Sequence, residues 1–548
     1  MPWCVSCPVG SSTSNPQKSR LNDAGNRIEQ SMPTDIATAY DFIVCGSGSS
    51  GSVVAGRLAE NPAVRILVLE AGGSDDVPQV MDPGQWFLNY GSEREWGFVA
   101  ERSASLNGRS VPQPMARILG GGSSINAMAW ARGHRSDWDE YAADVDDPSW
   151  GYKAVLETFR EIEDWHGPSE SWRRGVGGPI FIESAPDPHP VAIAAIEGAR
   201  TVGIPTYDSV NGVMMENWGG AALTDINVRA GIRNSVFRSY LHPYVGRPNV
   251  TVATGALVTR LTLDGNRVTG VEFSRNGSTH RVSASYEVVL SLGAINTPKV
   301  LMQSGIGDAE ELQSHGIDVV NHLPGVGRNL QDHVLISCVW ESPDPLRPHN
   351  NAGEALVFWK SRPELEAPDI QICLAEVPLC SPEVAARYPM PDNGWTMCGT
   401  VLHPRSRGTV RLGGPGPNDP VVIEANILAD EDDMSAAVAV VELCREIANS
   451  APVKPFAKRE VTPGPLRGGE LKRFIRDAAS SFSHQTCTAK MGRDEMSVVD
   501  GALKVYGAEH LRIADGSVLS RITSGNTMAP CVVIGERAAA IIKDAHRL

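Results

Sequence analysis

The sequence lacks the features that would direct it into a membrane or out of the cell. It contains no run of about 18 apolar residues, so we expect no membrane-spanning segment. The first forty residues have neither the apolar core nor the cleavage signature of a secretory peptide. Their Ser, Asn, Pro and Gln content predicts a disordered leader over residues 1–35.

Cysteines do not form the even, closely spaced pattern of a disulfide framework. The ten cysteines are scattered, which favours reduced thiols and a cytoplasmic location. Cys4 and Cys7 form one C-x-x-C, but zinc prefers four ligands, so we expect no metal site.

Positive charge is also scarce. The chain has 49 Lys and Arg against 64 Asp and Glu, a net charge of -15. Nucleic-acid binding requires clustered basic residues, so we expect no nucleic-acid partner. The run Asp430-Glu431-Asp432-Asp433 is best interpreted as the solvated start of a helix. The length allows two or more domains and a core large enough to enclose a sizeable cofactor.

Glycine, with 54 residues, is abundant, and it is informative where it follows a predicted strand. Tyr40 to Cys45 is an apolar, β-branched run that predicts a buried strand. It leads into Gly46-Ser47-Gly48-Ser49-Ser50-Gly51 and then into a helical pattern. In such a unit the first glycine makes the turn, the second admits a pyrophosphate and the third lets helix and strand pack.

The next strand supports the same interpretation. Val64 to Leu69 ends in Glu70, which follows Gly51 by 19 residues, where a carboxylate can accept hydrogen bonds from ribose hydroxyls. Strand, glycine turn, helix, strand and acid together predict a dinucleotide-binding unit. They do not distinguish NAD from FAD. A second glycine stretch, Ala116 to Asn126 (ARILGGGSSIN), predicts a loop that lies against a flat or phosphorylated ligand, although a structural turn would look the same.

Four longer motifs connect the chain to a known family. They are the stretch from Ala116 to Asp139, Gly293 to Gly307, Gly325 to His333, and Ser524 to Ile542. In this order they resemble the glucose–methanol–choline (GMC) oxidoreductases from about Tyr40 to the end of the chain.

The resemblance implies a mixed α/β fold, with a Rossmann-like FAD-binding domain and a second domain whose antiparallel sheet covers the flavin. We expect residues 36–164, 223–333 and 482–548 to form the FAD-binding domain. Residues 165–222 and 334–481 would form the substrate domain.

The resemblance also implies a set of FAD contacts, some through backbone and some through side chains. Glu70 should hold the adenosine ribose, Val258 should meet the adenine, and Asp515 should lie near the pyrophosphate. The full expected set is Gly46, Ser47, Gly48, Ser49, Ser50, Gly51, Glu70, Ala71, Trp96, Arg117, Leu119, Gly121, Gly122, Ser123, Asn126, Ala127, Met128, Ala129, Val258, Asp515, Gly516, Asn526, Thr527 and Met528. Covalently flavinylated relatives have a histidine where this chain has Ile125, so we expect non-covalent FAD.

Two residues are expected to be catalytic. An alcohol carbon releases hydride readily only when its hydroxyl proton is also removed, and histidine suits that role because its ordinary pKa is near 6.5. His484 (SFSHQTCTAKMG) matches the position of the family's histidine base. Asn526 matches the second position, where its amide can donate a hydrogen bond to the substrate oxygen. This His/Asn pair resembles choline oxidase and some bacterial alcohol oxidases and dehydrogenases.

The helix expected after Pro530 would begin beneath the flavin and stabilise negative charge there, unless it is an ordinary terminal helix. The resemblance thus implies FAD-dependent oxidation of a primary alcohol to an aldehyde, with hydride passing to flavin N5.

Several alternatives stay open at this level. The same fold could serve a lyase or a photodecarboxylase without net redox chemistry. The electron acceptor could be O2, a quinone or another carrier, and we favour a dehydrogenase slightly because Phe482 could restrict oxygen. The particular alcohol is undefined. Trp130, Phe358, Trp359 and His403 are candidates for the substrate pocket, with buried packing as the alternative.

Overall fold

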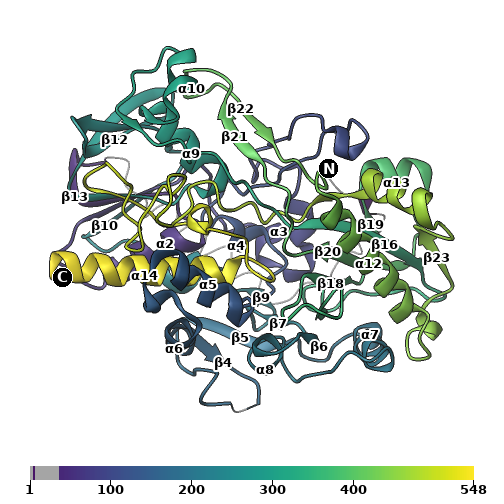
Figure 1. The fold of residues 1–548 in the computed structure, drawn as a ribbon. Helices are drawn as coiled ribbons and strands as arrows, with labels where there is room; N and C mark the ends of the chain where they lie inside the picture. The colour runs from purple at the N-terminus through teal and green to yellow at the C-terminus, as the bar shows by residue number, and fades with distance from the viewer. Residues whose placement is uncertain (1–3, 6–35, 169) are drawn as a thin grey trace.

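Two seven-stranded sheets form the framework of the molecule (Figure 1). The computed structural model describes residues 4–5, 36–168 and 170–548. The first sheet has the order β10-β3-β2-β13-β12-β11, and β25 pairs with β13. Its strands are β2 (Ala39–Cys45), β3 (Ile66–Leu69), β10 (Val250–Ala253), β11 (Leu257–Asp264), β12 (Arg267–Arg275), β13 (Ser278–Leu290) and β25 (Leu511–Ile513).

The first sheet is mixed, and its parallel half carries the predicted dinucleotide unit. β10, β3, β2, β13 and β25 are joined by parallel pairings, whereas β11, β12 and β13 form an antiparallel meander. Strand β2 is followed by α2 (Ser49–Ala59), which crosses to β3. The C-terminal helix α14 (Met528–His546) packs on α2, since a Cβ added to Gly535 would lie 2.7 Å from Cβ of Val53. All four residues of β3 are buried, and the sequence of this strand, ILVL, is continuously apolar.

The second sheet is antiparallel and has the order β23-β16-β20-β18-β17-β6, with β24 beside β16. Helix α12 (Glu431–Ala448) packs its apolar side on β20, where Val440 contacts Gly399. The strands are β6 (Gly220–Leu223), β16 (Val334–Glu341), β17 (Ala355–Trp359), β18 (Ile370–Ala375), β20 (Gly394–Val401), β23 (Arg459–Thr462) and β24 (Ser480–Ser481). β16 and β20 are buried along nearly their whole length, because helices cover one face of the sheet and the other face borders the interior.

The remaining elements connect or cover these two sheets. Small sheets are formed by β1 (Cys4–Val5) with β19 (Leu379–Cys380), β4 (Glu163–Trp165) with β5 (Ile180–Ser184) and β7 (Asp225–Ile226), β8 (Val228–Arg229) with β9 (Ile232–Arg233), β14 (Ile306–Gly307) with β15 (Asn321–His322), and β21 (Thr409–Leu412) with β22 (Val421–Glu424). The other α-helices are α3 (Pro78–Met81), α4 (Gly122–Ile125), α5 (Arg135–Val145), α6 (Tyr152–Ile162), α7 (Pro190–Thr201), α8 (Val213–Glu216), α9 (Gly293–Gln303), α10 (Ala309–Ser314), α11 (Pro382–Arg387) and α13 (Gly468–Ala478).

The predicted mixed α/β fold is thus confirmed, and the division into domains remains a proposal. All strands of the first sheet lie within residues 36–164, 223–333 and 482–548. Only Leu223 of the second sheet falls outside the segments expected for the substrate domain. The small sheet β4-β5-β7 pairs strands from both expected domains. The predicted leader lies outside the described residues except for Cys4–Val5, and Cys7 lies outside them too.

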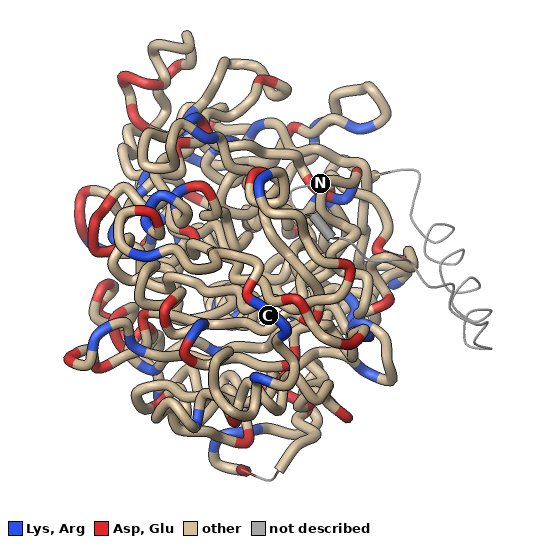
Figure 2. The backbone as a smooth tube through the Cα atoms, turned by 90° about the vertical axis from the view of Figure 1, so that its right-hand side faces the viewer, with Lys and Arg blue, Asp and Glu red and all other residues tan. Residues whose placement is uncertain are grey.

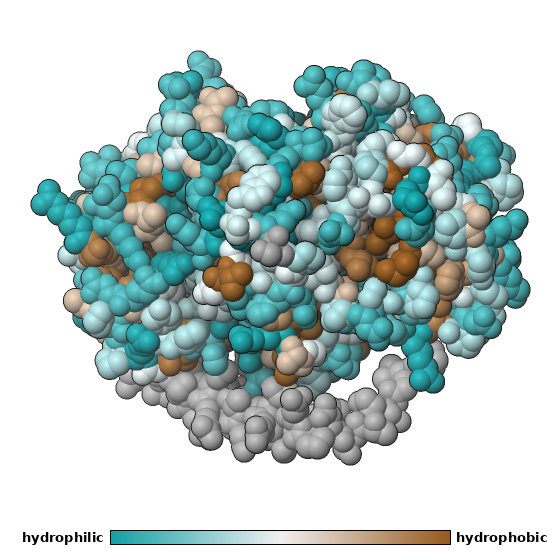
Figure 3. Space-filling view, turned by 90° about the horizontal axis from the view of Figure 1, so that it is seen from below, coloured by the Kyte–Doolittle hydropathy of each residue, from teal (hydrophilic) through white to brown (hydrophobic). Residues whose placement is uncertain are grey.

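Lys and Arg positions are interspersed with Asp and Glu positions along the described backbone (Figure 2). On the face in Figure 3, hydrophobic residues form separate groups among hydrophilic ones. Within the described residues, no helix has the length and apolar character needed to cross a membrane. The same residues contain no cluster of three or more His, Cys, Asp or Glu arranged to hold a metal ion.

The acidic run at 430–433 begins a helix as predicted. Asp430 caps α12 by accepting a hydrogen bond from the backbone N–H of Asp432. Asp433 differs from the expectation of a solvated side chain, because it is 2% exposed and accepts hydrogen bonds from the backbone N–H groups of Arg405 and Ser406.

Candidate active site

A cavity of about 870 Å³ lies where the two sheets face each other. The first sheet contributes the loops that follow β2, β3 and β13, and the second contributes side chains of β16, β18 and β20. One end is rich in glycine, serine and helix N-termini. The other end is apolar and contains His484.

Glycines shape the wall between β2 and α2. Gly46 has a φ of +97°, and a Cβ there would lie 2.3 Å from the carbonyl oxygen of Ser291. A Cβ at Gly51 would lie 2.1 Å from the carbonyl oxygen of Gly46, so α2 could not pack against β2. Gly48, in contrast, faces the cavity, and its Cβ would meet nothing closer than 4.0 Å. Backbone left open to a cavity in this way is what the close approach of a pyrophosphate requires.

Three of the longer helices begin at the cavity wall. The first turns of α2 (Ser49 and Ser50), α9 (Gly293 and Ala294) and α14 (Met528) all line it. Helix N-termini carry unpaired backbone N–H groups and partial positive charge, which stabilise phosphates and other anions. The start of α9 was missed as a binding element, although Gly293 at φ +79° directly after a long strand repeats the strand–glycine–helix signal of β2 and α2.

Two buried carboxylates flank this end of the cavity. Glu70 accepts hydrogen bonds from the N–H of Ser47 (3.0 Å), the hydroxyl of Ser47 (2.7 Å) and the N–H of Gly72 (2.8 Å). Asp515 accepts hydrogen bonds from the N–H of Gly293 and the hydroxyl of Thr297. Burial raises the pKa of both carboxyl groups, while these hydrogen bonds act in the opposite direction.

Most of the residues expected to contact FAD lie together on this wall. The cavity lining includes Gly46, Gly48, Ser49, Ser50, Glu70, Ala71, Trp96, Arg117, Gly121, Gly122, Asn126, Ala127, Ala129, Val258, Asp515, Gly516, Asn526, Thr527 and Met528. This wall combines exposed backbone groups, helix N-termini and apolar surface. Such a combination suits an elongated dinucleotide with a ring at each end.

Five of the expected residues are not in the cavity lining. Ser47 turns its hydroxyl to Glu70, Gly51 packs on Gly46, and Ser123 donates to the carbonyl oxygen of Gly120 (2.7 Å). The other two are Leu119 and Met128, which are buried in separate apolar clusters.

His484 and Asn526, the expected catalytic pair, meet at the other end of the cavity. His484 Nε2 and Asn526 Nδ2 are 3.4 Å apart, and both residues line the cavity. Burial lowers the pKa of His484 to about 3, so its imidazole is a neutral base. Thr527 is the N-cap of α14, so Asn526 directly precedes that cap. This places the positive end of the helix dipole at the same end of the cavity.

The pair is held by three residues that the sequence did not reveal. His333 Nδ1 lies 2.8 Å from His484 Nδ1, and Gln371 Nε2 donates to Asn526 Oδ1 at 3.3 Å. Asp332 accepts a hydrogen bond from the backbone N–H of His484 at 2.9 Å, and burial raises the pKa of its carboxyl to about 7. His333 ends the GVGRNLQDH motif, but Gln371 lies in an ordinary strand pattern.

The apolar end of the cavity has different walls from those predicted. Its aromatic side chains are Trp86, Tyr90 and Phe482, and the Phe482 ring lies 4.8 Å from that of His484. The aliphatic and thiol side chains around them are Leu335, Cys373, Leu374, Ala375, Leu379 and Cys398.

The expected pocket residues Trp130, Phe358, Trp359 and His403 are not in the lining. Phe358 is fully buried in a core cluster, Trp359 packs on the core of the second sheet, and His403 Nε2 contacts the hydroxyl of Ser524 at 2.7 Å.

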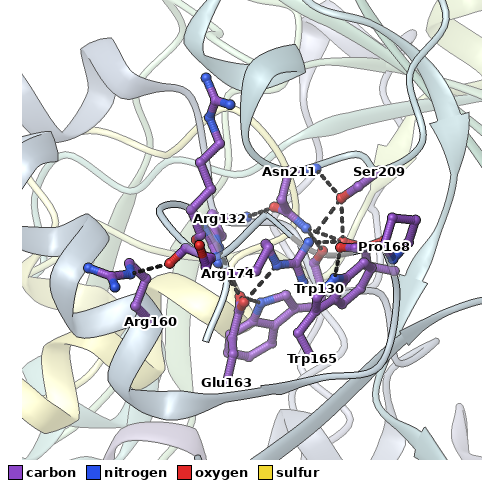
Figure 4. Close-up of polar contacts among 12 residues, drawn as sticks. Trp130, Arg132, Arg160, Glu163, Trp165, Pro168, Arg174, Ser209 and Asn211 are labelled. Carbon is purple, nitrogen blue, oxygen red and sulfur yellow. Dashed lines mark hydrogen bonds and ion pairs between the residues drawn. The ribbon is translucent and has the colours of Figure 1, made fainter. Parts of the chain in front are cut away.

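Trp130 instead belongs to a buried ion network (Figure 4). Its indole N–H donates to Glu163 at 2.7 Å, and Glu163 also accepts hydrogen bonds from Arg132 and Arg174. Burial alone would raise the pKa of Glu163, but the two guanidinium groups lower it below its usual 4.5. The network fixes the backbone next to Ala129, which lines the cavity.

Comparisons with known proteins agree with this architecture. The chain matches the GMC oxidoreductase family over residues 40–335 for the N-terminal part and residues 404–535 for the C-terminal part. It is 34% identical to the mitochondrial choline dehydrogenase of Homo sapiens, with 95% of this chain and 92% of that protein aligned. It is 37% identical to an uncharacterized GMC-type oxidoreductase of Mycobacterium tuberculosis, with 92% and 99% aligned.

Solved structures show the same fold. Pyridoxine 4-oxidase from Mesorbium loti superposes with a TM-score of 0.87 and 30% identity, covering 93% of this chain and 99% of that one. A formate oxidase of Aspergillus oryzae gives a TM-score of 0.85 and 25% identity, covering 94% and 100%. These relatives are oxidases and dehydrogenases and give no support to the lyase alternative. The chain belongs to the GMC oxidoreductase family and is an FAD-dependent oxidoreductase.

Proposed function

We propose that this chain oxidises an uncharged primary alcohol to an aldehyde, with His484 as the general base and Asn526 as a hydrogen-bond donor to the alcohol oxygen. The observation that carries the proposal is the 3.4 Å approach of His484 Nε2 to Asn526 Nδ2 on the wall of the cavity. A hydroxyl group placed between them can donate its proton to Nε2 and accept a hydrogen bond from Nδ2. Two groups with these opposite roles are what an alcohol oxygen needs as its proton leaves.

The two residues divide the work. His484 takes the hydroxyl proton at Nε2, because its imidazole is neutral at any working pH. Asn526 cannot titrate, so it holds the oxygen in place while negative charge develops there. FAD, when bound, supplies the hydride acceptor at flavin N5.

We propose that the FAD is dissociable. Ile125 lies in the cavity lining next to Asn126, and an aliphatic side chain has no nucleophile for a bond to the flavin. After denaturation of the purified holoenzyme, the yellow colour should leave the polypeptide on a gel. Flavin fluorescence that stays with the protein band would contradict this part of the proposal.

The apolar end of the cavity favours an uncharged substrate. The acidic lining residues Glu70 and Asp515 are engaged at the dinucleotide end, and Glu101 and Asp419 come from loops at the β21–β22 hairpin. Around His484 the lining carries no charged group, because aromatic, aliphatic and thiol side chains are joined there only by uncharged polar residues such as Ser483, Gln485 and Asn526. A cationic alcohol such as choline would have Trp86, Tyr90 and Phe482 for cation–π contact but no lining carboxylate there.

The electron acceptor and the cellular location complete the proposal. We propose that electrons pass from the flavin to O2 or to a quinone-type carrier. Release of hydrogen peroxide during turnover would identify O2 as the acceptor. Of the cysteines in the described residues, Cys45, Cys338, Cys373, Cys398, Cys444, Cys487 and Cys531 are free thiols, which supports a reducing, cytoplasmic setting.

Anaerobic reduction of the flavin tests the function directly. The holoenzyme is mixed with benzyl alcohol, hexanol and choline in separate experiments, and loss of flavin absorbance is followed. We expect bleaching by at least one neutral alcohol, and His484→Ala should slow it by about two to four orders of magnitude with FAD content unchanged. Reduction of the variant at the unaltered rate would show that His484 is not the base. If choline alone bleached the flavin, the proposal of an uncharged substrate would be wrong.

A further inference from the structure

We propose that His333 is a positioning residue that fixes the ring tautomer of His484, so that the unprotonated Nε2 faces the alcohol. This inference rests on the proposed function, because it explains how the base is prepared for that reaction. It concerns a residue outside the cavity lining, since His333 is fully buried behind His484.

The side of His333 that faces away from His484 determines which of its ring nitrogens is protonated. Its Nε2 lies 3.0 Å from the backbone carbonyl oxygen of Thr523. A carbonyl oxygen can only accept a hydrogen bond, so Nε2 of His333 carries the proton. Burial lowers the pKa of His333 well below 6.5, and the ring is therefore neutral. A neutral imidazole has one proton, which leaves Nδ1 of His333 as an acceptor.

The hydrogen bond between His333 and His484 determines which nitrogen of His484 carries the proton. His333 Nδ1 and His484 Nδ1 are 2.8 Å apart. Because His333 Nδ1 is an acceptor, the proton between them belongs to His484 Nδ1. Since His484 is also neutral, its Nε2 carries no proton. The opposite tautomer would bring two lone pairs together at 2.8 Å in a site with no exposed surface on His333.

The cavity side gives an independent argument for the same tautomer. Gln371 Nε2 donates to Asn526 Oδ1 at 3.3 Å, which turns the Asn526 amide nitrogen toward His484. That nitrogen can only donate, so His484 Nε2 must accept. Donors therefore point one way along the whole chain, from Gln371 through Asn526, His484 and His333 to Thr523. Exchanging the amide N and O positions of Gln371 and Asn526 would reverse the direction of the hydrogen bonds that these two residues make. The carbonyl oxygen of Thr523 can only accept, so the direction at that end of the chain is fixed.

The same arrangement determines what happens to the proton taken from the alcohol. His484 gains it at Nε2 while its Nδ1–H remains bonded to His333. His333 cannot pass a proton onward, because its own Nε2–H points at a carbonyl oxygen. The proton is held on His484 beside Asn526 until it leaves through the cavity.

Two substitutions separate the two hydrogen bonds of His333. In His333→Gln the side-chain amide can reach the Nε2 position and keep the bond to Thr523, but nothing accepts from His484. In His333→Asn the amide oxygen occupies the Nδ1 position and restores an acceptor. His403→Gln is the matched control, because His403 contacts the neighbouring Ser524 and lies outside the cavity lining.

The first readout is the limiting rate of anaerobic flavin reduction by benzyl alcohol, with its apparent Kd. We expect His333→Gln to lower the rate by about ten- to a hundredfold, the effect of losing the partner of a buried donor. Apparent Kd and FAD content should stay unchanged, His333→Asn should recover most of the rate, and His403→Gln should have the rate of the unaltered protein. Equal rates for His333→Gln and the unaltered protein, or equal losses in the Gln and Asn variants, would overturn the proposal.

The second readout does not depend on turnover. Histidine-selective 15N NMR of the intact holoenzyme distinguishes protonated from unprotonated ring nitrogens, and the signals that vanish in His484→Ala belong to His484. We expect a protonated Nδ1 and an unprotonated Nε2. The reverse pattern would overturn the role of His333 even if alcohols reduce the flavin. The expected pattern in a protein that no alcohol reduces would reject the proposed function and leave the tautomer assignment standing.

Discussion

The two ends of the cavity are built by different means. At the dinucleotide end, the wall consists of backbone at the junctions β2–α2 and β13–α9, where glycines remove side chains and helix N-termini supply N–H groups. At the His484 end, the wall consists of side chains that project from several strands of an antiparallel sheet, such as Leu335 and Cys398. The first design suits a ligand of fixed shape. The second can change its ligand by single substitutions without altering the fold.

The two ends of the cavity should therefore differ in how well they tolerate amino-acid substitutions. A glycine junction constrains the path of the chain, so an added Cβ disturbs both the cofactor site and the packing beneath it. A strand side chain that lines a cavity affects the substrate alone, provided its backbone stays paired. The substitutions below test this contrast, in order of decreasing expected effect.

Asn526→Ala should produce the largest change. It removes the donor to the alcohol oxygen, and loss of one such donor typically lowers the rate about a hundredfold or more. The limiting rate of anaerobic flavin reduction measures it, with FAD content as the control. If the variant reduced its flavin as fast as the unaltered protein, the amide would have no contact with the reacting oxygen.

Gly51→Ala tests the dinucleotide end. Its new Cβ would lie 2.1 Å from the carbonyl oxygen of Gly46, so β2 and α2 must separate. We expect a loss of about 1–3 kcal/mol in unfolding free energy and FAD binding weaker by about tenfold. Denaturant unfolding and FAD titration of the apoprotein measure the two effects.

Gly469→Ala is the matched control for this substitution, because its Cβ meets nothing within 4 Å and Gly469 lies on α13, away from the cavity. Equal behaviour of the two variants would remove the distinction between the junction and the rest of the fold.

Phe482→Ala tests the substrate end. The ring lies 4.8 Å from the His484 ring, and losing an aromatic contact should raise KM for benzyl alcohol about two- to tenfold. FAD affinity should not change. Trp359→Ala, at a position outside the lining, should leave KM unaltered. Weaker FAD binding in Phe482→Ala would contradict the separation of the two ends.

The smallest effect concerns pH. His484 is active when neutral, and its neutral fraction falls only as pH decreases through about 3. The flavin reduction rate should therefore show no histidine limb between about pH 5 and 8. Asp332, with a pKa raised to about 7, becomes negative as pH rises through that value and should increase the rate by about two- to threefold by stabilising the charged imidazolium. Asp332→Asn should remove this step. A limb near pH 6.5 that persists in Asp332→Asn would show that burial does not lower the pKa of His484.

The dinucleotide end of the cavity could be predicted from the sequence more completely than the His484 end. The strand at 40–45, the glycine turn, α2 and Glu70 were predictable because local backbone requirements leave a local pattern. His484 and Asn526 were found through longer motifs, and the structure brings them together. Gln371 and Leu335 could not be found, because a residue on a buried strand has the same pattern whether it faces a cavity or the core. Trp130 was assigned to the pocket from its position in the motif alone, and its partner Glu163 was not visible from local spacing.

The central claim is that His484 Nε2 and Asn526 Nδ2 share one alcohol oxygen above the flavin. A crystal structure of the FAD-loaded protein with a bound, unreactive alcohol analogue such as trifluoroethanol tests it most directly. We expect the oxygen of the bound analogue to lie within about 3 Å of both His484 Nε2 and Asn526 Nδ2. An oxygen bound elsewhere in the cavity, or nitrogens pointing to different groups, would contradict it.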